Sequence, residues 1–273
     1  MTDEICPQSG HLMLISPERV FYAGLLGRPR RRSIGGFGIY TALQGELRVA
    51  IEGRGVQHGV LALVPAYLAH SVESDHPTIG CLVIEPETVA PEMFDQLTRR
   101  CAEQGGALAS RIRSGYADLR RAPQPNGFST ADFDRRFFGE ALRARDIDAR
   151  IARAVALLND VSGRAVTAAC CAAAARLSPS RFLHLFKEQT GVSFRAFRAW
   201  KRARHLLHFV NAETNLAHLA QDIGYPDSTH FSHSIRRFYG LKPRAIFSGS
   251  RDLAIYRGDP VAASHRDLRQ GRA

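Results

Sequence analysis

A run of small residues that leads into a turn and a second helix constrains this chain more than any other feature. Residues 168–175 are all Ala or Cys, and Leu177, Ser178 and Pro179 follow closely. Proline fits the first turn of a helix, where its missing N–H costs no hydrogen bond, and serine before it fits the capping position. Small side chains let two helix backbones approach closely, so the run predicts two helices joined by a tight turn. The apolar face of the second helix would carry Phe182, Leu185 and Phe186.

A similar arrangement recurs about 48 residues further along the chain. Residues 216–225 predict a short helix stopped by Gly224, because glycine best tolerates a left-handed backbone. The residues from Pro226 to Ser228 then turn the chain, and residues 229–239 restart as a helix. The sequence therefore predicts two helix-turn-helix units.

In each unit, the second helix carries polar groups on the face opposite its apolar stripe. Arg and His donate to guanine edges, and hydroxyls and Lys reach phosphates or bases. Any one of these residues alone fits an ordinary solvated helix face, but two such faces in one basic block favour DNA. The expected DNA-binding residues are Ser180, Arg181, His184 and Lys187 in the first unit, and Ser228, Thr229, Ser232, His233, Arg236 and Arg237 in the second.

The charge of the chain is concentrated in the same half. The formal net charge is +11. Up to Arg145 there are 17 Lys and Arg against 16 Asp and Glu, and from Asp146 onward there are 20 against 10. A neutral half joined to a basic half is typical of a nucleic-acid-binding module attached to a domain with another task. A merely soluble basic protein is the alternative, but it leaves the asymmetry unexplained.

The N-terminal half has the pattern of a small β-domain followed by helices. Between residues 12 and 85, short apolar stretches alternate with turns rich in Gly or polar residues, which is typical of a sandwich or barrel. Residues 91–142 change to helix-like segments, and a helical block begins near Asp146. The apolar stretches are 37–43, 47–51, 60–64 and 79–84.

The C-terminal motifs resemble a known family. Residues 177–187, 190–194, 222–232 and 236–243 read LSPSRFLHLFK, TGVSF, DIGYPDSTHFS and RRFYGLKP. With these runs the chain resembles the AraC/XylS type of bacterial transcription regulator over residues 146–247. The resemblance implies two helix-turn-helix units joined by one helix, here from Phe194 to near Val210 and about 25 Å long at 1.5 Å per residue. It would hold the two reading helices in successive major-groove segments, about one helical turn apart.

Two residues depart from the pattern of that family. Arg176 stands where the family usually has glycine in the first turn, so that turn is expected to be wider or strained. Cys171 stands at a position usually filled by an aliphatic core residue, and we expect it to face the core as a small apolar side chain.

One stretch of the N-terminal half resembles part of a cupin motif. Residues 59–70 contain a glycine, a proline and then His70. A metal-binding cupin also needs a paired His-x-His in an earlier strand, and the corresponding region around Tyr40 has no histidine. We therefore expect no metal and no cofactor, and a β-barrel that binds a small effector or mediates pairing. Tyr40 and His70 are the candidate effector-pocket residues, and capping of a strand is the alternative role for His70.

The cysteines allow a different class of function. The chain has five, with no CxxC spacing, which argues against a disulfide framework and a structural zinc site. Cys170 and Cys171 lie side by side but lack a nearby His pair or CxxC to complete a sensor site. A cysteine-based sensor or DNA-repair regulator, and a ligand-binding cupin with incidental DNA affinity, remain the two alternatives.

Together these features predict an α+β chain of two domains. Residues 1–90 would form a cupin-like β-barrel for sensing or dimerisation, 91–145 a helical dimerisation or linker region, 146–249 the all-α domain with both helix-turn-helix units, and 250–273 a flexible tail. We expect a sequence-specific transcription regulator, either an activator or a repressor, and not an enzyme. Its expected partners are double-stranded DNA, a small effector, a second copy of the chain and RNA polymerase. No apolar run reaches the roughly 18 residues that span a bilayer, so a cytoplasmic, nucleoid-associated protein is expected. The charge division also predicts that a fragment from Asp146 to Ser250 folds alone.

Overall fold

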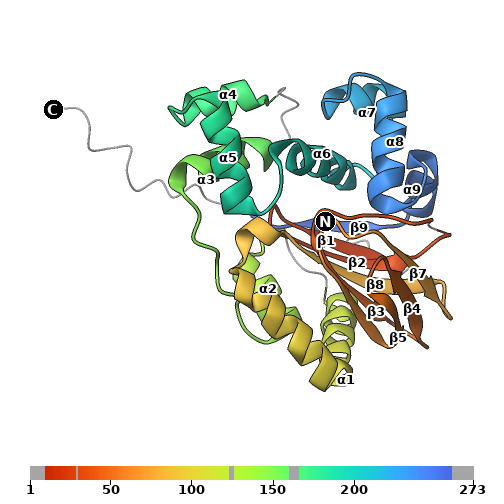
Figure 1. Cartoon of the computed structure of the whole chain (residues 1–273). Helices are drawn as coiled ribbons and strands as arrows, with labels where there is room; N and C mark the ends of the chain where they lie inside the picture. The colour runs from red at the N-terminus through yellow and green to blue at the C-terminus, as the bar shows by residue number, and fades with distance from the viewer. Residues whose placement is uncertain (1–9, 29, 123–125, 160–165, 260–273) are drawn as a thin grey trace.

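The computed structural model describes residues 10–28, 30–122, 126–159 and 166–259. Within them, the N-terminal half contains two β-sheets and two α-helices, and the C-terminal half is mainly helical (Figure 1). The predicted α+β class, with a β-rich N-terminal domain and a helical C-terminal domain, is confirmed. In the same ranges no helix combines the length and the apolar composition that crossing a membrane requires.

The strands form two sheets. The larger sheet has the order β6-β3-β8-β2-β1-β9 and the smaller one β5-β4-β7. A short 3₁₀ turn, η1 (Pro86–Thr88), follows the last N-terminal strand. The strands are β1 (Leu12–Ile15), β2 (Arg19–Leu25), β3 (Phe37–Ala42), β4 (Leu47–Ile51), β5 (Gly55–Gly59), β6 (Leu61–Val64), β7 (His70–Ser74), β8 (Thr78–Ile84) and β9 (Ala254–Arg257).

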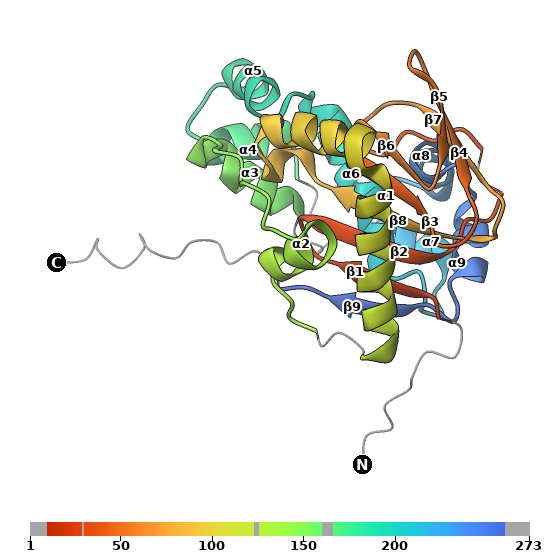
Figure 2. The same cartoon turned by 90° about the horizontal axis from the view of Figure 1, so that it is seen from below.

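Other parts of the chain cover both faces of the larger sheet. Successive side chains of a strand point to opposite faces. Leu12 and Leu14 therefore join the core under α1 (Pro91–Arg121) and α2 (Thr130–Phe138), whereas Met13 and Ile15 join a core shared with the C-terminal helices. The smaller sheet packs against the end formed by β3 and β6. Figure 2 shows α1 crossing one face of the sheet, with α2 beside it.

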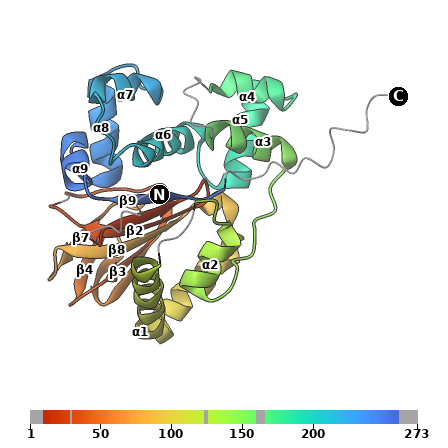
Figure 3. The same ribbon diagram turned by 180° about the vertical axis from the view of Figure 1, so that it is seen from behind.

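The C-terminal helices form two groups on either side of one joining helix (Figure 3). The first group has its own apolar core, and the second shares its core with the N-terminal sheet. The joining helix ends at His205 and continues as a 3₁₀ turn to His208, slightly short of the expected end near Val210. The elements are α3 (Ala149–Asn159), α4 (Ala168–Ala174), α5 (Pro179–Thr190), α6 (Phe194–His205), η2 (Leu206–His208), α7 (Leu216–Asp222), α8 (Ser228–Tyr239) and α9 (Pro243–Gly249).

The expected flexible tail from residue 250 is wrong for its first part. Ala254–Arg257 form β9, which pairs in parallel with β1 at the edge of the larger sheet. The free edge of β1 offers unpaired backbone groups, and four residues of β9 satisfy them. So short a strand beside an Arg-rich stretch gives little sequence signal. Residues 260–273 lie outside the described residues.

The two residues of the first unit that depart from the family pattern have distinct structural outcomes. Arg176 adopts a φ of 54°, a left-handed conformation that costs a residue with a side chain about 1–2 kcal/mol. The strained turn expected there is therefore present. Cys171 is buried in the core of the first group, whereas Cys170 is exposed.

Candidate nucleic-acid interface and interdomain cavity

The first unit folds as its local sequence predicts. The Ser178 hydroxyl accepts a hydrogen bond from the backbone N–H of Arg181, and Pro179 is the first residue of α5. Phe182 and Phe186 are buried against Phe194. The opposite face of α5 is exposed and carries all four predicted residues, Ser180, Arg181, His184 and Lys187. Leu183, which the sequence reasoning did not select, is exposed on the same helix.

The second unit repeats this construction with different caps. Asn215 caps α7, and the Asp227 carboxylate accepts a hydrogen bond from the backbone N–H of His230 at 2.8 Å to cap α8. Phe231, Ile235 and Phe238 face the core. Of the predicted residues, Ser228, Thr229, His233, Arg236 and Arg237 are exposed and Ser232 is half-buried.

Two side chains of α8 modify the predicted surface. His230, which the sequence reasoning missed, is exposed and pairs with Asp227 at 2.7 Å. Its position three residues after the cap is the signal that could have found it. Arg237 lies at the end of α8 that contacts the N-terminal domain, where its backbone oxygen accepts a hydrogen bond from Ser33.

A buried ionic cluster fixes the joining helix α6 to the N-terminal domain. The Lys201 ammonium lies 2.7 Å from a carboxylate oxygen of Glu85 and 2.6 Å from one of Glu87. Arg204 pairs with Glu85 at 2.8 Å and also donates to the backbone oxygen of Ser16. The Trp200 indole N–H donates to Glu85. All four charged residues are at most 4% exposed, so the cluster is closed to water.

The charges of the cluster control its protonation. Burial by itself raises the pKa of Glu85, but the charges of Lys201 and Arg204 outweigh burial and hold that pKa below its usual value. Burial raises the pKa of Glu87, and attraction to Lys201 offsets this only partly. Glu85 is therefore the permanent anion to which the three α6 side chains are anchored.

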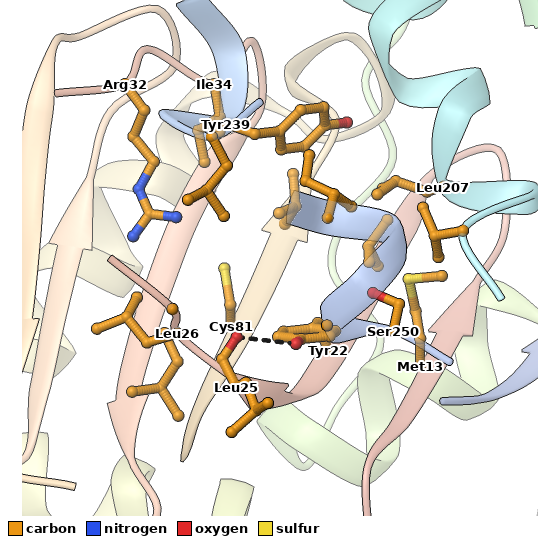
Figure 4. A pocket seen from close by; sticks show the side chains of 18 of the residues that line it. Met13, Tyr22, Leu25, Leu26, Arg32, Ile34, Cys81, Leu207, Tyr239 and Ser250 are labelled. Carbon is orange, nitrogen blue, oxygen red and sulfur yellow. Dashed lines mark hydrogen bonds between the residues drawn. The ribbon is translucent and has the colours of Figure 1, made fainter. Parts of the chain in front are cut away.

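An apolar cavity of about 210 Å³ lies between the larger sheet and the second unit. Figure 4 shows its lining side chains converging from both domains, with Arg32 projecting beside Ile34 and Leu26. The Arg32 guanidinium is the one charged group in this lining, and its Nε and Nη2 atoms are buried without a hydrogen-bond partner in the described structure. Burying the donors of a cation without hydrogen-bond partners costs free energy. The Nε and Nη2 atoms of Arg32 are therefore suited to bind an anionic group.

The two candidate effector residues lie beside Arg32. Tyr40 lines the cavity with its ring 5.1 Å from the Arg32 guanidinium carbon, and its hydroxyl donates to His70 Nε2 at 2.7 Å. His70 donates from Nδ1 to the backbone oxygen of Leu68, which leaves Nε2 as an acceptor. Burial lowers the pKa of His70 to about 4, so the ring is neutral near pH 7. His70 thus holds Tyr40 in place and does not itself line the cavity.

The cavity wall contains the thiol of Cys81. Burial raises the pKa of Cys81 to about 11, so its thiol is protonated at neutral pH. Among the described residues, no group of three or more His, Cys, Asp or Glu side chains could hold a metal ion.

Known proteins resemble both halves of this architecture. A helix-turn-helix domain family matches residues 171–248. The transcriptional activator RhaS of Escherichia fergusonii is 33% identical over 111 residues, which are 40% of this chain and 39% of RhaS. The chain thus matches about two fifths of the length of this relative. Over this C-terminal part, the chain is similar to regulators of the AraC/XylS type.

Two solved structures resemble the chain over both of its domains. The structure of ToxT from Vibrio cholerae O395 covers 85% of this chain and 98% of ToxT at 14% identity, with a TM-score of 0.53. An apo structure of a ToxT variant from Vibrio cholerae strain SCE256 covers 85% of this chain and 97% of that variant at 12% identity, with a TM-score of 0.51. At this identity the likeness shows that the two-domain fold is shared.

Proposed function

We propose that this chain regulates transcription by binding double-stranded DNA through α5 and α8. The observation that carries the proposal is the pair of exposed polar faces on these two helices, each the second helix of a capped turn unit and both attached to α6. RhaS is named a transcriptional activator, which supports the same role here. The ten predicted residues from Ser180 to Arg237 remain the proposed contacts.

A matched pair of variants tests this role. We expect Arg181→Ala to weaken binding to the operator by roughly 1–3 kcal/mol, because Arg181 lies early on the exposed face of α5. Arg99→Ala is the control, since it removes the same charge from the exposed surface of α1. Genome-wide mapping of bound sites identifies the operator for both measurements. Equal losses in the two variants would show that α5 binds DNA only through net charge, or does not bind it.

We propose that the cavity binds a compact apolar molecule with one carboxylate. Its lining is mainly apolar, and Arg32 is the one charged side chain among the described residues that line it, with buried donors that lack a hydrogen-bond partner. Its volume of about 210 Å³ lies below the roughly 300–1,000 Å³ of pockets for drug-sized ligands, which favours a compact ligand. One ToxT structure, with a TM-score of 0.51, is bound to (E)-4-(8-methylnaphthalen-1-yl)but-3-enoic acid, a molecule of this class.

Charge matching gives the test of this ligand class. Decanoate should bind the full chain and decanol should bind more weakly, because only decanoate pairs with the guanidinium. Arg32→Met should lower decanoate affinity about tenfold or more, which corresponds to about 1.4 kcal/mol, and leave decanol nearly unchanged. Equal binding of acid and alcohol in calorimetry would reject Arg32 as the counter-ion.

The roles proposed for the parts of the chain use the domain boundaries predicted from the sequence. We propose residues 1–90 as the sensing or pairing domain, 91–145 as its helical extension and 146–249 as the DNA-binding domain. A homodimer, contact with RNA polymerase and a nucleoid-associated cytoplasmic location are proposed with it, as is the absence of enzymatic activity. Sedimentation analysis with and without operator DNA tests the dimer.

A thiol-based sensor is supported less well. The thiolate is the reactive form of cysteine, and burial raises the pKa of Cys81 and of Cys101 to about 11. Cys171 has a raised pKa for the same reason, and Cys6 lies outside the described residues. Stoichiometric modification of the native chain by an alkylating agent, with a change in DNA affinity, would favour this alternative.

A further inference from the structure

The segment Arg30–Ile34, between β2 and β3, contacts the cavity on one side and α8 on the other. Arg32 and Ile34 line the cavity. The backbone N–H of Ser33 donates to the oxygen of Arg237 at 2.9 Å, and that of Arg30 donates to the oxygen of Gly240 at 2.9 Å. The same short segment thus carries the proposed counter-ion and holds the end of a proposed DNA-reading helix.

These two backbone bonds complete the C-terminal cap of α8. The last carbonyl groups of a helix have no partner within the helix. In α8 the N–H of Gly240 satisfies Arg236, and the N-terminal domain supplies the donor for Arg237. The contact is tight, because a Cβ at Gly240 would lie 2.3 Å from the backbone oxygen of Arg30.

The first unit has the same cap without this contact. Gly191 ends α5 with a φ of 78°, close to the 72° of Gly240, and its N–H satisfies Lys187. A Cβ at Gly191 would meet nothing within 4 Å. The N-terminal domain touches α5 at η1, and no residue of α3, α4 or α5 that the structure describes lines the cavity.

The segment is anchored to the β-domain by several bonds. The backbone groups of Arg32 exchange two hydrogen bonds with His70, both at 2.9 Å. Ile34 accepts from the N–H of Tyr67 at 2.7 Å, and the Ser33 hydroxyl donates to the oxygen of Tyr67 at 2.8 Å. A displacement of Arg32 is therefore carried by the whole segment to α8.

We infer that a ligand in the cavity acts on the second helix-turn-helix unit through Arg30–Ile34 and leaves the first unit unchanged. This inference rests on the proposed binding of a carboxylate at Arg32. A charge that pairs with the guanidinium repositions the segment, and the segment repositions the C-terminal end of α8. The effector then changes contacts in the part of the operator that α8 reads.

Two glycine variants of the full chain separate this path from general strain. Gly240→Ala and Gly191→Ala place the same left-handed strain at the ends of α8 and α5, but only the first collides with Arg30. Decanoate binding is measured by calorimetry, operator affinity with and without decanoate by fluorescence anisotropy, and amide exchange of residues 228–240 and 179–190 by mass spectrometry.

The expected results differ between the variants. In the wild type and in Gly191→Ala, decanoate should change operator affinity about fivefold or more and alter exchange only in residues 228–240. At decanoate concentrations that calorimetry shows to be saturating for this variant, Gly240→Ala should lose the response of operator affinity. A full response in Gly240→Ala, or an equal exchange change in residues 179–190, overturns the inference.

Other variants test the inference if Gly240→Ala does not fold or if decanoate does not bind. If Gly240→Ala does not fold, Ser33→Pro removes the N–H donor from the other side, with Ser33→Ala as its control. If decanoate does not bind the wild type, the proposed ligand class is wrong. The path is then tested in unliganded protein by Arg32→Met, which should change exchange in residues 228–240 and not in 179–190. Unchanged exchange in both segments overturns the inference.

Discussion

Removing the charge of Glu85 tests how strongly the N-terminal domain holds α6. Glu85→Gln keeps the size of the side chain and removes the anion that pairs with Lys201 at 2.7 Å and with Arg204 at 2.8 Å. Glu87 remains as an anion for Lys201, but Arg204 keeps only neutral oxygen atoms as partners. The cluster then holds two buried cations and one anion.

The burial of the cluster sets how much stability Glu85→Gln should lose. Breaking a buried ion pair from one side costs about 3–5 kcal/mol, because an uncompensated charge stays buried. Such a loss is a large part of the roughly 5–15 kcal/mol that stabilises an ordinary domain. Glu73→Gln is the control, because the pair of Glu73 with Arg48 is exposed and worth about 1 kcal/mol at most.

The cluster contains its own reporter. Trp200 is the one tryptophan of the chain, and its indole bonds to Glu85. Urea unfolding followed by its fluorescence measures the loss for each variant. The double variant Glu85→Gln with Arg204→Gln should recover part of the stability, since one cation and one anion remain. If Glu85→Gln alone lowered the free energy of unfolding by less than about 1 kcal/mol, as for an exposed pair, the buried cluster would not fix α6 to the N-terminal domain.

Four other outcomes follow from the same contacts. DNA affinity should fall steeply as salt rises, because Lys and Arg contacts release counterions, and titrations at several salt concentrations measure the slope. Arg236→Ala, two turns into α8, should weaken binding to all sequences about equally, whereas Arg181→Ala should relax preference at one base position, as competition with operator variants measures. Arg176→Gly should stabilise the chain by about 1 kcal/mol in urea unfolding, since it relieves a left-handed φ of 54°. Burial lowers the pKa of His70 from 6.5 to about 4, so the unfolded chain binds that proton first and stability falls as pH drops from about 6.5 to 4. His70→Gln should flatten unfolding free energy against pH in that window.

The turn units could be predicted because their signals are local. Ser178 and Pro179 begin α5, and Gly240 ends α8, by contacts within a few residues. Tertiary packing does not need to be known for such caps.

The buried ionic cluster on α6 could not be predicted, because its members are distant in sequence. Glu85 is separated from Lys201 by 116 residues. The run from Arg198 to His205 has the composition of a solvated basic helix, and its charges contribute to the excess of the basic half. In the folded chain Lys201 and Arg204 are buried and neutralised by Glu85 and Glu87. Part of the basic charge therefore serves the interdomain contact and is not available to DNA.

Contacts between residues distant in sequence also matter for the prediction that a fragment from Asp146 to Ser250 folds alone. The first unit has an apolar core to which the β-domain contributes no residue. The second unit does not close its core alone, because Met13, Ile15 and Val83 complete it from the larger sheet. A fragment without the sheet would expose that surface together with Lys201 and Arg204. The periodic apolar residues of a helix indicate that it has a buried face, but they do not indicate which element covers that face. For the second unit the covering element is the sheet that also forms a wall of the cavity, so the unit that depends most on the N-terminal domain is the one that the cavity adjoins.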